Sequence, residues 1–243
     1  MRYKVTLSYD GTHYHGFQKQ QNSHSIEAEI NQALFKIHKK PIKIIASGRT
    51  DKGVHALGQV FDFKSHLKMT CEQFKKALNS YLPKDIYIKE VEVVSDHFNA
   101  RHSAVKKTYK YIINQEFDVF KRSHELYYPY KIDIALLKEA TKSFIGTHDF
   151  YGFAGYVKDK PTIKTIYDAN VVVDQSRIII TFIGNGFLKY MVRKMVGTIL
   201  DISSGKKPLS IIDTIFETKD RNLCGKTINP EGLYLVEVDY ERN

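Results

Sequence analysis

Strand-like and helix-like patterns alternate along the whole chain, and this alternation constrains its fold more than any other feature. Every second residue from 3 to 9 is apolar or aromatic, which is the period of a half-buried strand (Tyr3, Val5, Leu7, Tyr9). From Ser25 onward apolar residues recur at helical spacing. Thr70 and Gln73 form a capping-box pattern that opens a second helix, and Pro83 ends it. Strands are predicted at residues 86–94 and 108–114, so the first half should form a sheet with helices on one face.

The second half begins after a polar, aromatic-rich link at residues 115–130 and mixes helices and strands in a similar proportion. Asp133 is an expected N-cap, and strands are predicted at residues 163–173, 177–184 and 233–238. Pro208 is expected to start a helix. Before it, a long helix carries its apolar residues on one face (Leu188, Met191, Val192, Met195, Val196, Ile199). The pattern predicts an α+β protein, although no residue-level repeat relates the two halves.

Charge and composition narrow the class of protein. The 243 residues include 37 Lys and Arg against 27 Asp and Glu, a net charge of +10, so the protein should attract a polyanion such as RNA, DNA or an anionic membrane. No run of eighteen apolar residues occurs, and the first residues lead directly into a strand. We therefore expect a soluble, cytoplasmic protein with no membrane association. Cys71 and Cys224 lie far apart without a CxxC pair, which argues against a disulfide framework and a structural zinc site.

One acidic residue stands in a short basic loop between two strand-like segments, in the stretch GRTDKGVHA at residues 48–56. Asp51 is flanked by Arg49, Lys52 and His55, so positive charge should favour its anionic form and draw a polyanion to the same place. An attacking or proton-accepting carboxylate needs this environment. A surface turn in which Asp51 neutralises its neighbours fits the residue types about as well.

GRTDKGVHA resembles the catalytic-loop signature of the tRNA pseudouridine synthase A family. Further segments match the family in the same order along the chain: YDGT at 9–12, GFQ at 16–18, FNAR at 98–101, KTYKY at 107–111, GTHDF at 146–150 and GFLKYMVR at 186–193. The family more often has Trp at the position of Phe17, and Lys189 and Tyr190 vary the usual pair of the last motif. Neither departure removes a group with acid-base chemistry.

The resemblance implies two ferredoxin-like halves, residues 1–105 and 106–243, that form one mostly antiparallel sheet with helices on its back and a central basic cleft. It also implies an isomerase that converts uridine to pseudouridine at positions 38, 39 and/or 40 of the tRNA anticodon stem-loop. Members of the family act as homodimers that hold one tRNA jointly. The reaction leaves the composition of the nucleoside unchanged, so no cofactor is expected.

Three residues are expected to carry the chemistry. The resemblance makes Asp51 the nucleophile or base, and the sequence leaves open whether it attacks the nucleotide or removes a sugar proton. Arg193 would pair with the carboxylate, since a guanidinium stays charged when buried; an isolated Arg on a polar helix face is more often simply solvated. Tyr109 is expected to stack on the extruded base first and to handle a proton second. A core aromatic role suits Tyr109 and Tyr111 equally.

The remaining predictions concern RNA binding. Phosphate contacts are expected from basic residues whose segments the fold would bring to one cleft (Arg49, Lys52, His55, Arg101, Lys107, Lys110, Lys189). His13 and His15 would share one face of a strand, but no third ligand accompanies them, so no metal is expected. Two other classes stay open: a catalytically silent RNA-binding protein of the same fold, and a metal-dependent nuclease, which would need a cluster of carboxylates around Asp51.

Overall fold

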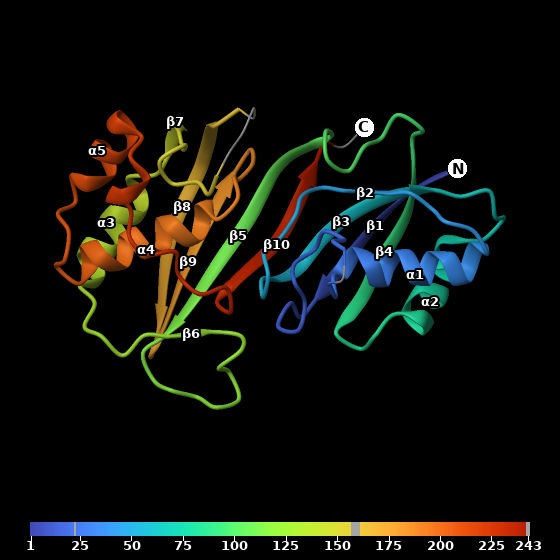
Figure 1. The fold of residues 1–243 in the computed structure, drawn as a ribbon, viewed down its shortest axis with the longest axis horizontal. Helices are drawn as coiled ribbons and strands as arrows, with labels where there is room; N and C mark the ends of the chain where they lie inside the picture. The colour runs from blue at the N-terminus through green and yellow to red at the C-terminus, as the bar shows by residue number, and fades with distance from the viewer. Residues whose placement is uncertain (22, 157–160, 242–243) are drawn as a thin grey trace. The chain divides into compact units, whose positions relative to one another are not determined.

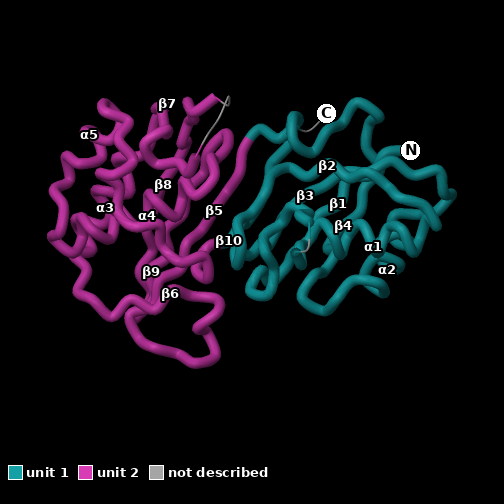
Figure 2. The backbone as a smooth tube through the Cα atoms, in the orientation of Figure 1, with its two compact units in different colours: residues 1–105, 234–243 teal, residues 106–233 magenta. Residues whose placement is uncertain are grey.

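The computed structural model describes residues 1–21, 23–156 and 161–241 and shows an α+β architecture (Figure 1). The backbone divides into two compact units, Met1–Val105 with Tyr234–Asn243, and Lys106–Leu233 (Figure 2). The sequence-based division placed residues 234–243 in the second half. The structure groups them with the first unit, where Tyr234 and Leu235 pair with His55 and Ala56. No helix in the described part of the chain is long and apolar enough to span a membrane.

The first unit is a mostly antiparallel sheet with two helices. Its strands are β1 (Arg2–Tyr9), β2 (Ile44–Ala46), β3 (His55–Lys64), β4 (Ile86–Val94) and β10 (Leu233–Tyr240). They follow the order β4-β1-β3-β10, with β2 pairing beside β3, and β10 alone runs parallel to its neighbour β3. The helices α1 (Ile26–His38) and α2 (Cys71–Tyr81) lie together on one side of these strands (Figure 1).

The sequence pattern accounts for this unit closely. Residues of β1 are alternately buried and half-buried, as the period of two predicted. Thr70 and Gln73 form the capping box at the start of α2, and both of its reciprocal hydrogen bonds are present. The ring of Tyr3 lies 4.7 Å from that of Phe74 and 5.4 Å from that of Phe63, which joins strand to helix in one core.

The second unit is built in the same manner. Its strands are β5 (Ala104–Asn114), β6 (Leu126–Tyr127), β7 (Gly146–Asp149), β8 (Ile163–Asp174) and β9 (Arg177–Gly184). The order is β5-β9-β8-β7, all antiparallel, and β6 adds a short parallel pairing to β5. Its helices are α3 (Ile134–Lys142), α4 (Met191–Ser203) and α5 (Ile211–Thr218), followed by a 3-10 turn at Arg221–Leu223.

Two expectations for this unit differ in outcome. Asp133 caps α3 as predicted, accepting a hydrogen bond from the Leu136 N–H at 3.0 Å. The prediction that Pro208 starts a helix was wrong, because α5 begins only at Ile211. Residues 208–210 instead form a turn, in which the N–H of Ile211 donates to the Pro208 carbonyl at 3.2 Å.

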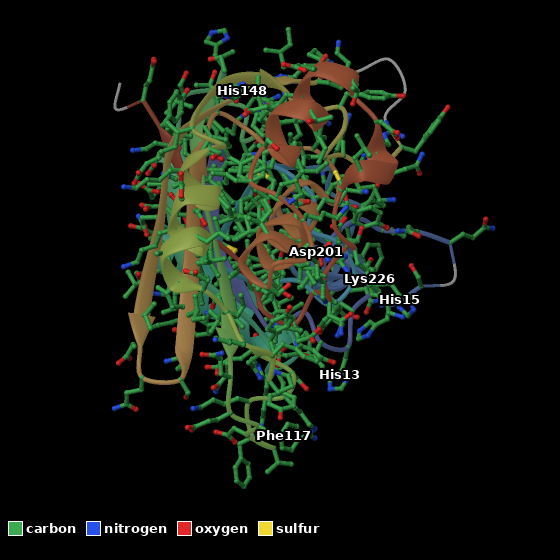
Figure 3. All side chains as sticks on the ribbon, turned by 90° about the vertical axis from the view of Figure 1, so that its left-hand side faces the viewer. His13, His15, Phe117, His148, Asp201 and Lys226 are labelled. Atoms are coloured by element: carbon green, nitrogen blue, oxygen red, sulfur yellow. The ribbon has the colours of Figure 1, made fainter. Side chains whose placement is uncertain are left out.

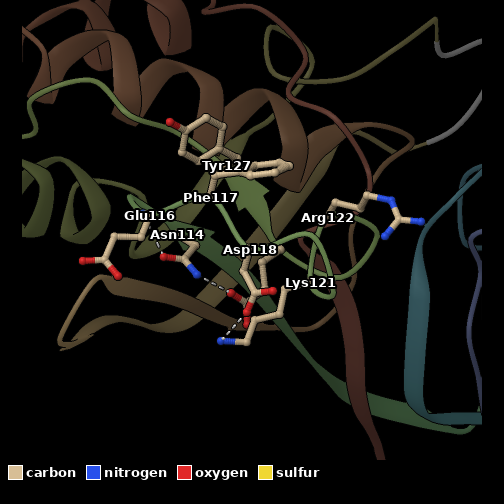
Figure 4. Close-up of a pocket in the computed structure, with 8 residues that line it drawn as sticks. Asn114, Glu116, Phe117, Asp118, Lys121, Arg122 and Tyr127 are labelled. Atoms are coloured by element: carbon tan, nitrogen blue, oxygen red, sulfur yellow. Dashed lines mark hydrogen bonds and ion pairs between the residues drawn. The ribbon is translucent and has the colours of Figure 1, made fainter.

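The link at residues 115–130 is ordered by charged contacts. Glu125 is 6% exposed, accepts a hydrogen bond from Asn114 at 2.9 Å and pairs with Arg177 at 2.7 Å. Asp118 and Lys121 form a second ion pair in the loop at 3.3 Å. A small pocket nearby is lined by residues of this link and of the end of β5 (Asn114, Glu116, Phe117, Asp118, Lys121, Arg122, Glu125 and Tyr127; Figure 4). None of the lining residues is a predicted site residue.

Candidate active site

Asp51 lies in the loop that joins β2 to β3 in the first unit. Asp51 is partly exposed, and the neighbouring Arg49 and Lys52 are exposed. The loop turns back on itself where the N–H of Val54 donates to the Asp51 carbonyl at 3.2 Å, and Gly53 takes a φ of +76° there. The loop thus presents one carboxylate between two exposed cations.

A second segment, residues 11–17, supports this loop from beneath. The N–H of Phe17 donates to the Thr50 carbonyl at 3.1 Å, and the N–H of Gly53 donates to the Tyr14 carbonyl at 3.2 Å. Gly16 has a φ of +96°, and a Cβ there would lie 2.7 Å from the Thr50 oxygen. At Gly11 a Cβ would lie 2.0 Å from the Val54 oxygen. Only glycine allows the two backbones to approach so closely, so the position of Asp51 depends on these glycines.

Buried polar side chains hold the other side of the loop. The hydroxyls of Tyr9 and Thr50 are hydrogen-bonded at 2.8 Å. Gln59 accepts from the Ser47 hydroxyl at 2.6 Å and donates to the Gly48 carbonyl at 3.3 Å. Burial raises the pKa of Tyr9 to about 12, so its phenol stays protonated near neutrality and serves as a structural hydrogen-bonding group. The loop is therefore fixed at both ends before any substrate binds.

His55 lies in a different place from that expected of an RNA-contacting residue. It is the first residue of β3, is 1% exposed and stacks on the ring of Tyr234 at 4.7 Å. Its Nδ1 accepts a hydrogen bond from the N–H of Gly11 at 3.1 Å. This burial gives the imidazole no surface for a nucleotide, and its contacts instead tie the segment at residues 11–17 to the end of the Asp51 loop.

Arg193 lies in the first turn of α4 in the second unit. Its Nε donates to the carbonyl of Ile228 at 2.5 Å, and its guanidinium carbon lies 5.4 Å from the ring centroid of Tyr190. The face of α4 that carries Arg193 is partly covered. At Gly197 a Cβ would lie 2.0 Å from the Lys226 oxygen, so residues 225–228 pack directly along it. Arg193 itself stays partly exposed at the edge of that segment.

Tyr109 lies in β5 and is partly exposed, whereas Tyr111 is fully buried and donates its hydroxyl to the Asn229 carbonyl at 2.6 Å. The ring of Tyr109 meets that of Phe187 edge to face at 4.9 Å. A half-exposed ring supported by a second ring suits the stacking role proposed for Tyr109. The core role that suited both tyrosines belongs to Tyr111.

The basic residues predicted to contact RNA differ in exposure. Within the described residues, Arg101 and Lys189 are exposed, and Lys107 and Lys110 are partly buried. The ladder between β5 and β9 is regular through these positions, so Lys107 and Lys110, three residues apart, lie on opposite faces of the strand. Desolvation, together with the nearby Arg177, lowers the pKa of Lys110. RNA bound along one face of β5 could therefore contact only one of these two lysines.

The histidines outside the Asp51 loop differ in their surroundings. His13 and His15 do not share a strand face as expected, since residues 12–15 form turns in which both side chains are exposed (Figure 3). The ring of His148 stacks on Phe216 at 4.4 Å, and Asp149 pairs with Lys219 at 2.8 Å.

Sequence reasoning did not identify two of the supports described above. The segment at residues 11–17 was noted only as a matching motif, although its two glycines are a signal for close backbone approach. The Ile228 carbonyl that holds Arg193 left no signal, because any residue type can supply a backbone oxygen.

Comparison with known proteins decides the family. The model of a family described as tRNA pseudouridine synthase matches residues 6–103 and 140–241. A tRNA pseudouridine synthase A of an Exiguobacterium strain is 45% identical over 99% of this chain and 98% of its own length. That of Listeria monocytogenes serotype 4b is 44% identical over 99% of both chains. The chain belongs to the tRNA pseudouridine synthase A family.

This membership confirms the expectation of an isomerase. Among solved structures, a Cbf5–Nop10–Gar1 complex resembles the chain distantly, with a TM-score of 0.37 and 10% identity over 81% of this chain and 53% of that one. The match to pseudouridine synthases A is instead continuous in sequence and covers both compact units.

Proposed function

We propose that the protein converts uridine to pseudouridine at positions 38, 39 and/or 40 in the anticodon stem-loop of tRNA. The observation that carries the proposal is the Asp51 loop, which holds one partly exposed carboxylate in a chain related over its whole length to tRNA pseudouridine synthases A. A protein that only bound RNA would gain nothing from a carboxylate directed at phosphates.

In this proposal Asp51 attacks the nucleotide or removes a sugar proton after the base has left its stack. Two glycines and two buried hydroxyls hold its loop, which reduces the reorganisation needed when the substrate arrives. Arg193 stabilises the ionised carboxylate in the active complex. Tyr109, supported by Phe187, stacks on the extruded base, and its hydroxyl is the second candidate for proton transfer.

The RNA is held by phosphate contacts from exposed cations. Arg49, Lys52, Arg101 and Lys189 are exposed and carry no acidic partner that would neutralise them among the ion pairs of the described residues. We propose that they supply sequence-independent affinity, and that the two ferredoxin-like halves contribute to one basic cleft. We further propose that the protein acts in the cytoplasm as a homodimer, in which two copies hold one tRNA.

The test is incubation with an unmodified tRNA transcript, without added metal or nucleotide, followed by mapping of pseudouridine. The proposal predicts pseudouridine at one or more of positions 38 to 40. Tight binding with no pseudouridine would identify a silent RNA-binding protein. Modification only outside the anticodon arm would refute the target, and a requirement for a cation would refute the predicted independence from cofactors.

A further inference from the structure

The start of α4 holds Arg193 from two directions. The Nε of Arg193 donates to the Ile228 carbonyl at 2.5 Å, and the backbone N–H of Ile228 donates to the Arg193 carbonyl at 3.4 Å. The ring of Tyr190 lies 5.4 Å from the guanidinium carbon. The Nε side of the guanidinium therefore meets a backbone oxygen, and the group lies over an aromatic ring. In this arrangement Arg193 would hold a carboxylate through Nη1 and Nη2, which together can donate two hydrogen bonds to it.

Tyr190 occupies a backbone position that does not suit tyrosine. It is the N-cap of α4, with φ of 63° and ψ of 0°, and its side chain makes no capping hydrogen bond. A left-handed conformation costs a non-glycine residue about 1–2 kcal/mol. Asn suits both the N-cap and this conformation better, so stability alone favours a residue other than tyrosine. Strain of this kind is typical of positions whose side chain has a task.

A neighbouring segment is shaped to receive the Tyr190 ring. At Gly155 a Cβ would lie 2.8 Å from Cδ2 of Tyr190, and the Gly155 N–H donates to the Lys189 carbonyl at 2.8 Å. The segment that follows GTHDF thus packs against Tyr190. This packing limits the positions open to the ring and gives the segment a part in holding it.

We propose that Tyr190 is a positioning residue, whose ring orients the guanidinium of Arg193 toward the carboxylate that the reaction uses. The inference rests on the proposed function, in which Arg193 stabilises ionised Asp51. Tyr190 touches neither substrate nor reacting atoms, and its effect passes through Arg193. Lys189 lies over the same ring at 4.8 Å, so loss of the ring also loosens an RNA-contacting lysine. Loosening Lys189 should lower RNA affinity, whereas displacing Arg193 should lower turnover.

The test compares Tyr190→Asn with Tyr190→Phe. A cation–π contact contributes about 0.5–2 kcal/mol, so Asn should lower kcat by about twofold to thirtyfold. The melting temperature should stay level or rise, because Asn relieves the backbone strain. Phe keeps the ring and should restore most of kcat. The acid limb of the pH profile should move to higher pH in the Asn variant alone, since a less well held cation favours ionisation of the carboxylate less.

Tyr130→Asn is the matched control, since that ring also lies under a cation, Lys206 at 5.7 Å, and has no predicted part in the reaction. Gly155→Ala tests the same idea with Tyr190 in place, because the added methyl must push the ring away; it should lower kcat in the same direction. Wild-type kcat in Tyr190→Asn, or equal losses in the Asn and Phe variants, would overturn the inference.

The two proposals fail in different ways. If Arg193→Ala and Asp51→Ala both keep wild-type turnover, the proposed function fails. If those variants are inactive while Tyr190→Asn and Gly155→Ala turn over as the wild type does, the proposed function stands and only the positioning role is lost.

Discussion

Replacing Gly16 with alanine should displace the Asp51 loop and reduce activity more than stability. The added methyl would lie 2.7 Å from the Thr50 oxygen and 3.2 Å from the Asp51 carbonyl carbon, whereas ordinary contact begins at 3.4 Å. Relief of the clash therefore requires a movement of about 0.7 Å in the backbone that carries Asp51. A misplacement of about 1 Å at a reacting group costs on the order of 100-fold in rate. We predict a fall in kcat/KM of that size.

The cost in stability has two parts that a control separates. Alanine at a φ of +96° carries the left-handed penalty of about 1–2 kcal/mol, and overpacking adds about 1–3 kcal/mol. Gly205→Ala is the matched variant, since Gly205 has a φ of +76° and an added Cβ there meets nothing within 4 Å. Gly205→Ala should lose only the backbone penalty of about 1–2 kcal/mol in the free energy of unfolding, and its kcat/KM should be unchanged.

Urea unfolding of the two variants, followed by steady-state kinetics on a tRNA transcript, measures both effects. The reasoning is refuted if Gly16→Ala retains wild-type kcat/KM. It is also refuted if the two variants lose the same free energy of unfolding, because the contact with Thr50 would then cost nothing.

Three further predictions follow from the described contacts. Burial lowers the pKa of His38 below its usual value near 6.5, so the free energy of unfolding should fall as pH drops below about 6.5, and His38→Gln should reduce that pH dependence in urea titrations. Tyr109→Phe should keep most of kcat if the ring, supported by Phe187, acts by stacking on the extruded base; a loss of kcat as large as that of Asp51→Ala would show that the Tyr109 hydroxyl transfers a proton. Exchanging Arg49 and Lys52 for Gln should flatten the slope of log affinity against log salt by about 1.5, and an unchanged slope would place the RNA elsewhere.

Most of the secondary structure was predictable because local chemistry determines it. The alternation from Tyr3 to Tyr9, the capping box of Thr70 and the N-cap of Asp133 each specify an element through neighbouring residues alone. The error at the start of α5 reflects a local turn. Pro208 suits a helix start, yet the chain first makes a turn and begins α5 at Ile211.

The sequence selected candidate site residues but not the contacts that support them. Asp51 and Arg193 were selected by the family resemblance of their motifs, since their residue types alone fit a surface turn or a solvated helix face as well. His55 stands in the same motif as Asp51 but is buried, because it is the first residue of β3 and pairs with β10. That pairing joins residues about 180 positions apart, and local patterns carry no information on contacts of such range.

The account depends on the carboxylate of Asp51, and Asp51→Asn tests it most directly because the amide keeps the shape and removes the charge. The measurement is single-turnover formation of pseudouridine in an unmodified tRNA transcript, with RNA affinity measured in parallel. We predict no detectable pseudouridine and an affinity within a few-fold of the wild type. Pseudouridine formed by Asp51→Asn at the wild-type rate would contradict the central claim.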